Sequence, residues 1–155
     1  MLIPGREYRV DEVLAQKAPM CLLDTIDAYG PDWVRAGVLI REDSLFFVPA
    51  LGVPGWVGLE FMAQAAAAYG GIEQRQQGEV PTIGLLIGTR DYRCEQEYFP
   101  AGARLAVLAR LLIRDENDFV AYDCDIVDRA RTLARAVLKA CRPRDLGTVL
   151  SGSLS

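Results

Sequence analysis

Two polar side chains, Glu60 and Gln64, interrupt an otherwise apolar stretch of this 155-residue chain and are the best placed to do chemistry. Every other residue from Pro54 to Ala68 is apolar, glycine or alanine. Residues four positions apart lie on one face of a helix, so the Gln64 amide can orient the Glu60 carboxyl. An apolar surround would remove hydration from that carboxyl and favour its protonated form, which suits proton exchange near neutral pH. We expect Glu60 to carry acid–base chemistry; the alternative is a carboxylate bonded to Gln64 and backbone with no chemistry.

The same stretch predicts one long helix from about Pro54 to Gln77. A proline fits the first turn of a helix, the run of alanines favours helix, and Gly78 can end it. The start of such a helix presents unpaired N–H groups and a positive dipole end, and Gly55 lets an oxygen atom approach them. Gly55 is therefore a second candidate site residue, with a plain turn glycine as the alternative.

The composition excludes several kinds of site. The chain has no histidine, which removes Ser-His and Cys-His nucleophile pairs, histidine metal sites and histidine general bases. The net charge is −4 and no basic stripe is present, so we expect no nucleic-acid partner. The 4 cysteines are far apart, which indicates reduced thiols and no metal site. The first residues lack the pattern of a secretion signal and the long helix carries polar residues, so we expect a cytoplasmic protein with no membrane span.

The segments around the helix favour β-structure. Strands are expected at residues 21–29, 33–40, 82–94 and 119–127, and a short helix near Asp11 to Leu14. Residues 104–113 and 132–141 are ambiguous between helix and strand. One buried helix among such strands suggests an α+β fold with an antiparallel sheet packed on the helix. We expect a single domain over residues 1–143 and a loosely held tail over residues 144–155.

Residues 53–64, VPGWVGLEFMAQ, resemble the central-helix motif of the hotdog-fold β-hydroxyacyl-ACP dehydratases, which include the FabZ-like and FabA-like enzymes. Residues 14–24, LAQKAPMCLLD, and the block from residue 84 to YFPAGARL at residues 98–105 resemble other family motifs in the same order. The resemblance covers about residues 13–143 and looks closest to a dehydratase-like branch found with aryl-polyene and related polyketide-type clusters. It implies a hotdog fold, in which an antiparallel sheet wraps around one long central helix and both ambiguous segments are strands.

The resemblance also implies roles for individual residues. Glu60 matches the family carboxylate that helps the C3 hydroxyl to leave, and Gly55 matches the glycine whose N–H polarises the thioester carbonyl. Counted back without gaps, the family's catalytic histidine falls at Phe46, so only half of the catalytic pair is present. Phe46, Phe47 and Trp56 are expected to line an apolar acyl pocket, with plain core packing as the alternative.

Two arginines, Arg90 and Arg93, lie on the strand that follows the helix. By resemblance this strand flanks the pantetheine tunnel, and the arginines could bind phosphate or an acidic acyl carrier protein. Solvated surface charge is the alternative for both. Tyr92, Cys94 or Tyr98 could replace the missing acid–base group, and nothing in the sequence selects one of them.

Several functions remain open from the sequence. The first is a 3-hydroxyacyl-ACP dehydratase-like enzyme of fatty acid or polyketide/aryl-polyene biosynthesis. The second is a non-catalytic or half-catalytic subunit of a hetero-oligomeric dehydratase, and the third is a hotdog acyl-thioesterase that uses Glu60. A fourth is a protein that only binds acyl groups. No cofactor is expected beyond the phosphopantetheine of ACP or CoA that carries the substrate.

The expected partners follow from the same resemblance. They are an acyl carrier protein, an acyl thioester and a second hotdog subunit. The family pairs two sheets edge to edge, with the active sites at the interface. We therefore expect a homodimer or higher homo-oligomer that pairs through residues 82–94, or a heterodimer with a histidine-containing hotdog paralogue.

Overall fold

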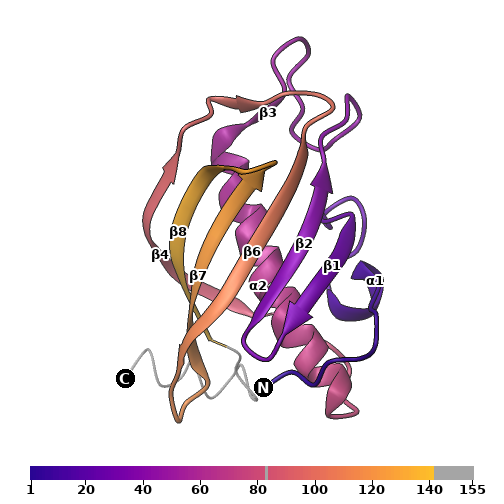
Figure 1. The fold of residues 1–155 in the computed structure, drawn as a ribbon, viewed down its shortest axis with the longest axis vertical. Coiled ribbons are helices and arrows are strands. Elements are labelled where there is room, and N and C mark those ends of the chain that lie inside the picture. Colours follow the sequence, from indigo (N-terminus) through magenta and orange to yellow (C-terminus); the bar gives the residue numbers. More distant parts are fainter. Residues whose placement is uncertain (83, 142–155) are drawn as a thin grey trace.

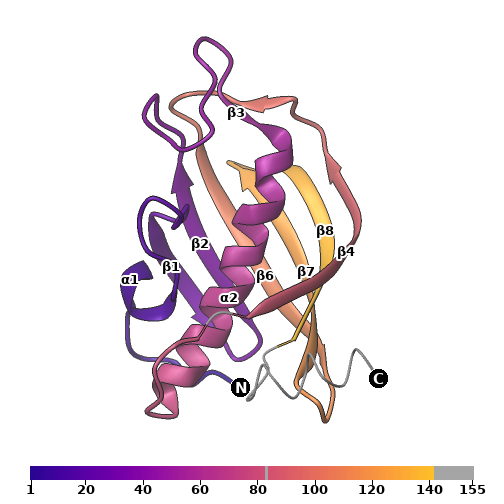
Figure 2. The ribbon, with the colours of Figure 1, turned by 180° about the vertical axis from the view of Figure 1, so that it is seen from behind.

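The fold is a six-stranded antiparallel sheet wrapped around one long helix, as Figure 1 and Figure 2 show from opposite sides. The computed structural model describes residues 1–82 and 84–141. The predicted α+β hotdog fold is confirmed. In order across the sheet the strands are β1 (Thr25–Gly30), β2 (Trp33–Leu39), β6 (Arg104–Arg114), β7 (Phe119–Asp128), β8 (Arg131–Cys141) and β4 (Leu85–Cys94).

The central helix begins one turn later than a simple reading of the sequence predicts. A 3₁₀ turn, η1 (Gly55–Val57), leads into α2 (Gly58–Gln76). Pro54 lies outside the helix, because it belongs to the short strand β3 (Val53–Pro54), which pairs with β5 (Tyr98–Phe99). This small second sheet fixes the start of the helix beside the segment that follows β4. The predicted end near Gln77 is confirmed.

The helix runs without interruption through Gly70 and Gly71, and the second glycine packs tightly against the backbone of Val13. A methyl group on Gly71 would clash with the carbonyl oxygen of Val13. Val13 ends the short helix α1 (Val10–Val13), which packs against α2. Gly71 therefore lets α1 approach the central helix.

The inner face of the sheet covers α2 with alternating side chains. In β7 the predicted alternation is confirmed, since Tyr122, Cys124 and Ile126 are buried against the helix. In β6, Leu105 and Val107 are buried in the same two-residue period. Both segments of ambiguous periodicity, at residues 104–113 and 132–141, are strands. Their outward positions also carry several apolar residues, which hides the alternation in the sequence.

The first strand is shorter than the predicted residues 21–29. Residues 21–24 precede β1, and the backbone N–H of Leu22 donates to the helix side chain Gln64 rather than to a strand. All four cysteines are free thiols. No helix of the described residues is both long and apolar enough to cross a membrane. The predicted tail, residues 144–155, lies outside the described residues.

Candidate acyl-thioester site

The Gln64 side chain is held in one orientation within the candidate site. Its side chain is 1% exposed, and its amide oxygen accepts a hydrogen bond from the backbone N–H of Leu22 at 2.8 Å. Its amide nitrogen donates to the Met20 carbonyl at 2.8 Å and to the Glu60 carboxylate at 3.0 Å. The backbone partners fix the orientation of the amide, because an N–H needs an acceptor and a carbonyl needs a donor. The predicted Gln64–Glu60 contact is therefore present, and the segment at residues 20–22 holds it in place.

Glu60 is exposed to solvent in the isolated chain. The expectation that an apolar helix buries this carboxyl is wrong for the single subunit, and the desolvation it requires is absent. The helix is apolar on this side because small alanines, Ala63 and Ala67, follow Glu60 on the same face. These residues line a cavity of about 150 Å³ between the helix and the sheet, whose other walls include Ala66, Val120, Tyr122 and Leu138. The carboxylate thus borders an apolar groove.

The start of the helix lies close to the strand end of β4 and the residues after it. The N–H of Gly55 donates to the carbonyl of Glu97 at 2.8 Å, and the carbonyl of Gly55 accepts from the Tyr92 hydroxyl at 2.5 Å. The N–H group that the family resemblance assigns to the thioester carbonyl is therefore already hydrogen-bonded. The next N–H in the first turn belongs to Trp56, and a helix supplies no acceptor for it.

The three aromatic residues predicted to line an acyl pocket do not line the Glu60 groove. Phe46 and Trp56 are 45% and 64% exposed and form a T-shaped pair with ring centroids 5.6 Å apart. Phe47 is half-buried and packs against the core. Phe46 has a φ of 69°, a left-handed conformation that costs about 1–2 kcal/mol for a residue with a Cβ. Phe46 and Trp56 form an exposed aromatic pair near the helix start.

Arg90 and Arg93 lie on the outer face of the sheet. Arg93 is paired with the exposed Arg135, and Arg90 with Val137, and directly opposed residues point to the same face. Neither arginine has an ion-pair partner among the described residues. They are therefore available to an anionic partner, but they point away from the helix and its groove.

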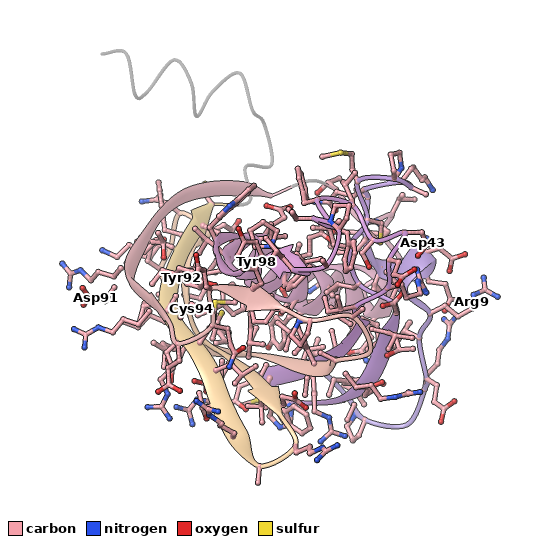
Figure 3. All side chains as sticks on the ribbon, turned by 90° about the horizontal axis from the view of Figure 1, so that it is seen from above. Arg9, Asp43, Asp91, Tyr92, Cys94 and Tyr98 are labelled. Atoms are coloured by element: carbon pink, nitrogen blue, oxygen red, sulfur yellow. The ribbon has the colours of Figure 1, made fainter. Side chains whose placement is uncertain are left out.

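Of the three residues considered as substitutes for the missing base, Tyr92 and Cys94 lie together at the helix start. Figure 3 looks onto this end of the molecule and shows both inside the rim on which Asp91 lies. Burial, reinforced by Cys94, raises the pKa of the Tyr92 hydroxyl well above its usual range, so this group stays a hydrogen-bond donor. The Cys94 thiol contacts the carbonyl of Gln96 at 3.2 Å. Tyr98 pairs with Pro54 through β5. Tyr92, which is held as a hydrogen-bond donor, therefore offers no base.

Sequence analysis did not identify the residues that are distant in the chain and orient Gln64. Met20 and Leu22 act through backbone groups 44 and 42 positions from Gln64, which no local pattern reveals. The spacing of Glu60, Ala63 and Ala67 along one helix face was the available signal for the groove. In residues 1–82 and 84–141, no group of three or more carboxylate or thiol side chains is gathered closely enough to hold a metal ion.

Replacing Gln64 with leucine should destabilise the chain by about 1–3 kcal/mol, because Leu22 N–H and the Met20 carbonyl would lose their partner. Urea unfolding of the purified protein measures this change. Gln77→Leu, at an exposed position near the helix end, is the control and should change the free energy of unfolding by less than about 0.5 kcal/mol. Equal stability of the two variants would contradict the assigned role of Gln64.

The architecture defines the class: this is a hotdog-fold protein, with a carboxylate beside an apolar groove. The sequence profile of the ApeP-like family, described as ApeP dehydratase, matches residues 8–151. The chain belongs to the ApeP-like dehydratase family. A comparison with curated proteins finds no match.

Solved structures share the fold of this chain. The chain is similar to the dehydratase heterocomplex ApeI:P from Xenorhabdus doucetiae, with a TM-score of 0.82 and 28% identity over 94% of this chain and 97% of that chain. It also shares its fold with a mutant of the thioesterase SAV0944 from Staphylococcus aureus, with a TM-score of 0.56 and 13% identity over 76% of this chain and 90% of that chain. A mutant of the phenylacetic acid degradation protein PaaI from Thermus thermophilus gives a TM-score of 0.55 at 14% identity, over 76% and 91% of the two chains.

Proposed function

We propose that this chain is the Glu60-bearing subunit of a hetero-oligomeric dehydratase that acts on 3-hydroxyacyl thioesters of polyketide or aryl-polyene type. The observation that carries the proposal is a positioned carboxylate beside an apolar groove in a chain with 0 histidines. The family assignment and the likeness to a structure described as a dehydratase heterocomplex support it. A second hotdog subunit would supply the histidine.

The histidine and Glu60 would act as the base and the acid of one elimination reaction. The partner's histidine removes the proton from C2 while the Glu60 carboxylic acid donates its proton to the C3 hydroxyl, which leaves as water. The C2–H and C3–O bonds break, and a C2=C3 double bond forms. The histidine then holds the proton taken from C2, and a transfer from it to the Glu60 carboxylate restores both groups. Negative charge develops on the thioester oxygen, which backbone N–H donors at the helix start can stabilise.

The exposed position of Glu60 is consistent with an active site that a second subunit completes. The carboxylate faces solvent in the isolated chain, although a general acid needs a shielded surround to hold its proton near neutral pH. Among the described strands, β4 pairs only with β8 and leaves its other edge open. A subunit paired along that edge would cover the nearby groove and desolvate Glu60. The exposed Phe46–Trp56 pair would give the same partner an apolar contact.

The proposal is tested by purifying this chain alone and together with a histidine-bearing hotdog subunit encoded in the same genome. The mixture should form an alkene from a 3-hydroxyacyl thioester, and the chain alone should show little turnover. A fully active pure homodimer would refute the division of the site. Release of free thiol without alkene would instead identify an acyl-thioesterase that uses Glu60.

We also propose that the substrate arrives on an acyl carrier protein that binds Arg90 and Arg93. Reversing both charges, Arg90→Glu with Arg93→Glu, should raise KM for the carrier-bound substrate about tenfold, because two exposed ion pairs are lost and each contributes about 0.2–1 kcal/mol. KM for the same acyl group on pantetheine alone should not change. Arg35→Glu, an exposed arginine on β2, is the control. An equal rise in KM for both substrates would show damage to the active site rather than loss of docking.

A further inference from the structure

We infer that Tyr92 is a positioning residue, which fixes the peptide between Gly55 and Trp56 so that the Trp56 N–H is the donor to the thioester oxygen. This inference rests on the proposed function and names a residue of that same site. Three observations carry it: the occupied N–H of Gly55, the hydrogen bond that holds the Gly55 carbonyl, and the close approach of the Tyr92 hydroxyl that Gly58 permits.

The first observation removes the donor that the family resemblance implies. The Gly55 N–H donates to the Glu97 carbonyl at 2.8 Å, which anchors the helix start to the segment after β4. An N–H already committed to one acceptor can give a second oxygen only a weak, shared bond. Trp56 follows directly, and its N–H lies in the first turn, where helical geometry provides no acceptor. The strongest available donor at this end is therefore the Trp56 N–H.

The second observation fixes the direction of that donor. In a planar trans peptide the carbonyl and the N–H point in opposite directions. The Tyr92 hydroxyl donates to the Gly55 carbonyl at 2.5 Å, so it holds one end of the Gly55–Trp56 peptide. The Trp56 N–H must then point away from Tyr92. Burial raises the pKa of the Tyr92 hydroxyl, so this group keeps its proton and can donate the hydrogen bond at neutral pH.

The third observation shows that the local sequence accommodates this contact. A methyl group on Gly58 would clash with the Tyr92 hydroxyl oxygen, and one on Gly55 would clash with the Gln96 carbonyl oxygen. The pairing of β4 with β8 shifts between Arg90 and Arg93, and Asp91 has a φ of 52°. Such a bulge re-aims side chains near active sites. Here it leaves Asp91 on the outside and Tyr92 on the inside (Figure 3).

The test uses Tyr92→Phe in the assembled heterocomplex. The matched control is Tyr29→Phe, which also removes a hydroxyl that donates to a backbone carbonyl, that of Arg6, but on β1 and outside the site. Tyr92→Phe should lower kcat at least about tenfold, a fraction of the 10²- to 10³-fold lost when an oxyanion donor is removed. KM should stay within about twofold, because the acyl groove is untouched and a donor that acts mainly in the transition state leaves ground-state binding unchanged. Tyr29→Phe should change neither value. An unchanged kcat in Tyr92→Phe would overturn the inference.

A spectroscopic measurement separates positioning from a general structural effect. The infrared band of a ¹³C-labelled carbonyl in a bound α,β-unsaturated acyl pantetheine should lie at lower frequency with the unmodified complex than with Tyr92→Phe. Gly58→Ala displaces the same hydroxyl and should give the same change if Tyr92→Phe fails to assemble. Lower activity with an unshifted band would overturn the inference. Binding of this product analogue needs no turnover, so the band tests Tyr92 even if the dehydratase proposal fails.

Discussion

Glu60→Gln should lower the dehydration rate of the assembled heterocomplex by about 10²- to 10⁴-fold, the usual contribution of a general acid. Glutamine has nearly the same size and can still accept the hydrogen bond from Gln64, so the fold should not change. It cannot donate a carboxylic acid proton to the leaving hydroxyl. Initial rates with a 3-hydroxyacyl thioester, measured at saturating substrate, check this expectation.

The control for Glu60→Gln is Glu42→Gln, which removes an exposed carboxylate away from the groove and should leave the rate unchanged. Thermal unfolding should give the same Tm for both variants and for the unmodified complex. Turnover that persists in Glu60→Gln would show that the partner subunit contains a complete site of its own. This chain would then be a binding or scaffolding subunit.

Phe46→His should raise the dehydratase activity of the chain without its partner by at least about tenfold. By the family resemblance Phe46 occupies the position of the catalytic histidine. Histidine is also among the residues enriched in the left-handed conformation that Phe46 adopts at a φ of 69°. The substitution would give a self-associated form of this chain both catalytic groups. Single-turnover assays are suited to the low rates expected.

The double variant Phe46→His with Glu60→Gln isolates the cause of that gain. If the histidine and the carboxylate act as one unit, the gain should vanish. If the Phe46→His variant folds correctly but gains no activity, the loop that carries residue 46 does not align with the family loop that carries the histidine. A gain that survives the loss of Glu60 would assign the acid to another residue.

The sequence predicted the elements with a strong local signature. The central helix was recognisable from its alanines and the strand β7 from its two-residue alternation. The segments at residues 104–113 and 132–141 could be predicted as strands only from the family resemblance. In β6, apolar residues at outward positions mask the alternation. Local periodicity reports which face is buried, and it fails where both faces carry apolar residues.

The site was predicted less completely, for two physical reasons. An apolar helix indicates burial, but it does not say whether the chain's own core or another subunit covers each face, so the exposure of Glu60 was not foreseen. The hydrogen bonds of Gly55 to Glu97 and Tyr92 join residues 42 and 37 positions apart. The bulge that turns Tyr92 inward lies between Arg90 and Arg93, where no glycine marks it in the sequence. Only Gln64, four residues from Glu60, was predictable from helical spacing.

The open edge of β4 also affects how long a subunit without its partner would survive in a cell. A strand of 10 residues with one open edge offers backbone hydrogen bonds to any unfolded chain nearby, and the exposed Phe46–Trp56 pair offers apolar surface. Subunits made in excess would thus be substrates for chaperones and proteases, and their lifetime would depend on the supply of partner. We expect the amount of this protein in a cell to follow the amount of its partner, with the surplus degraded.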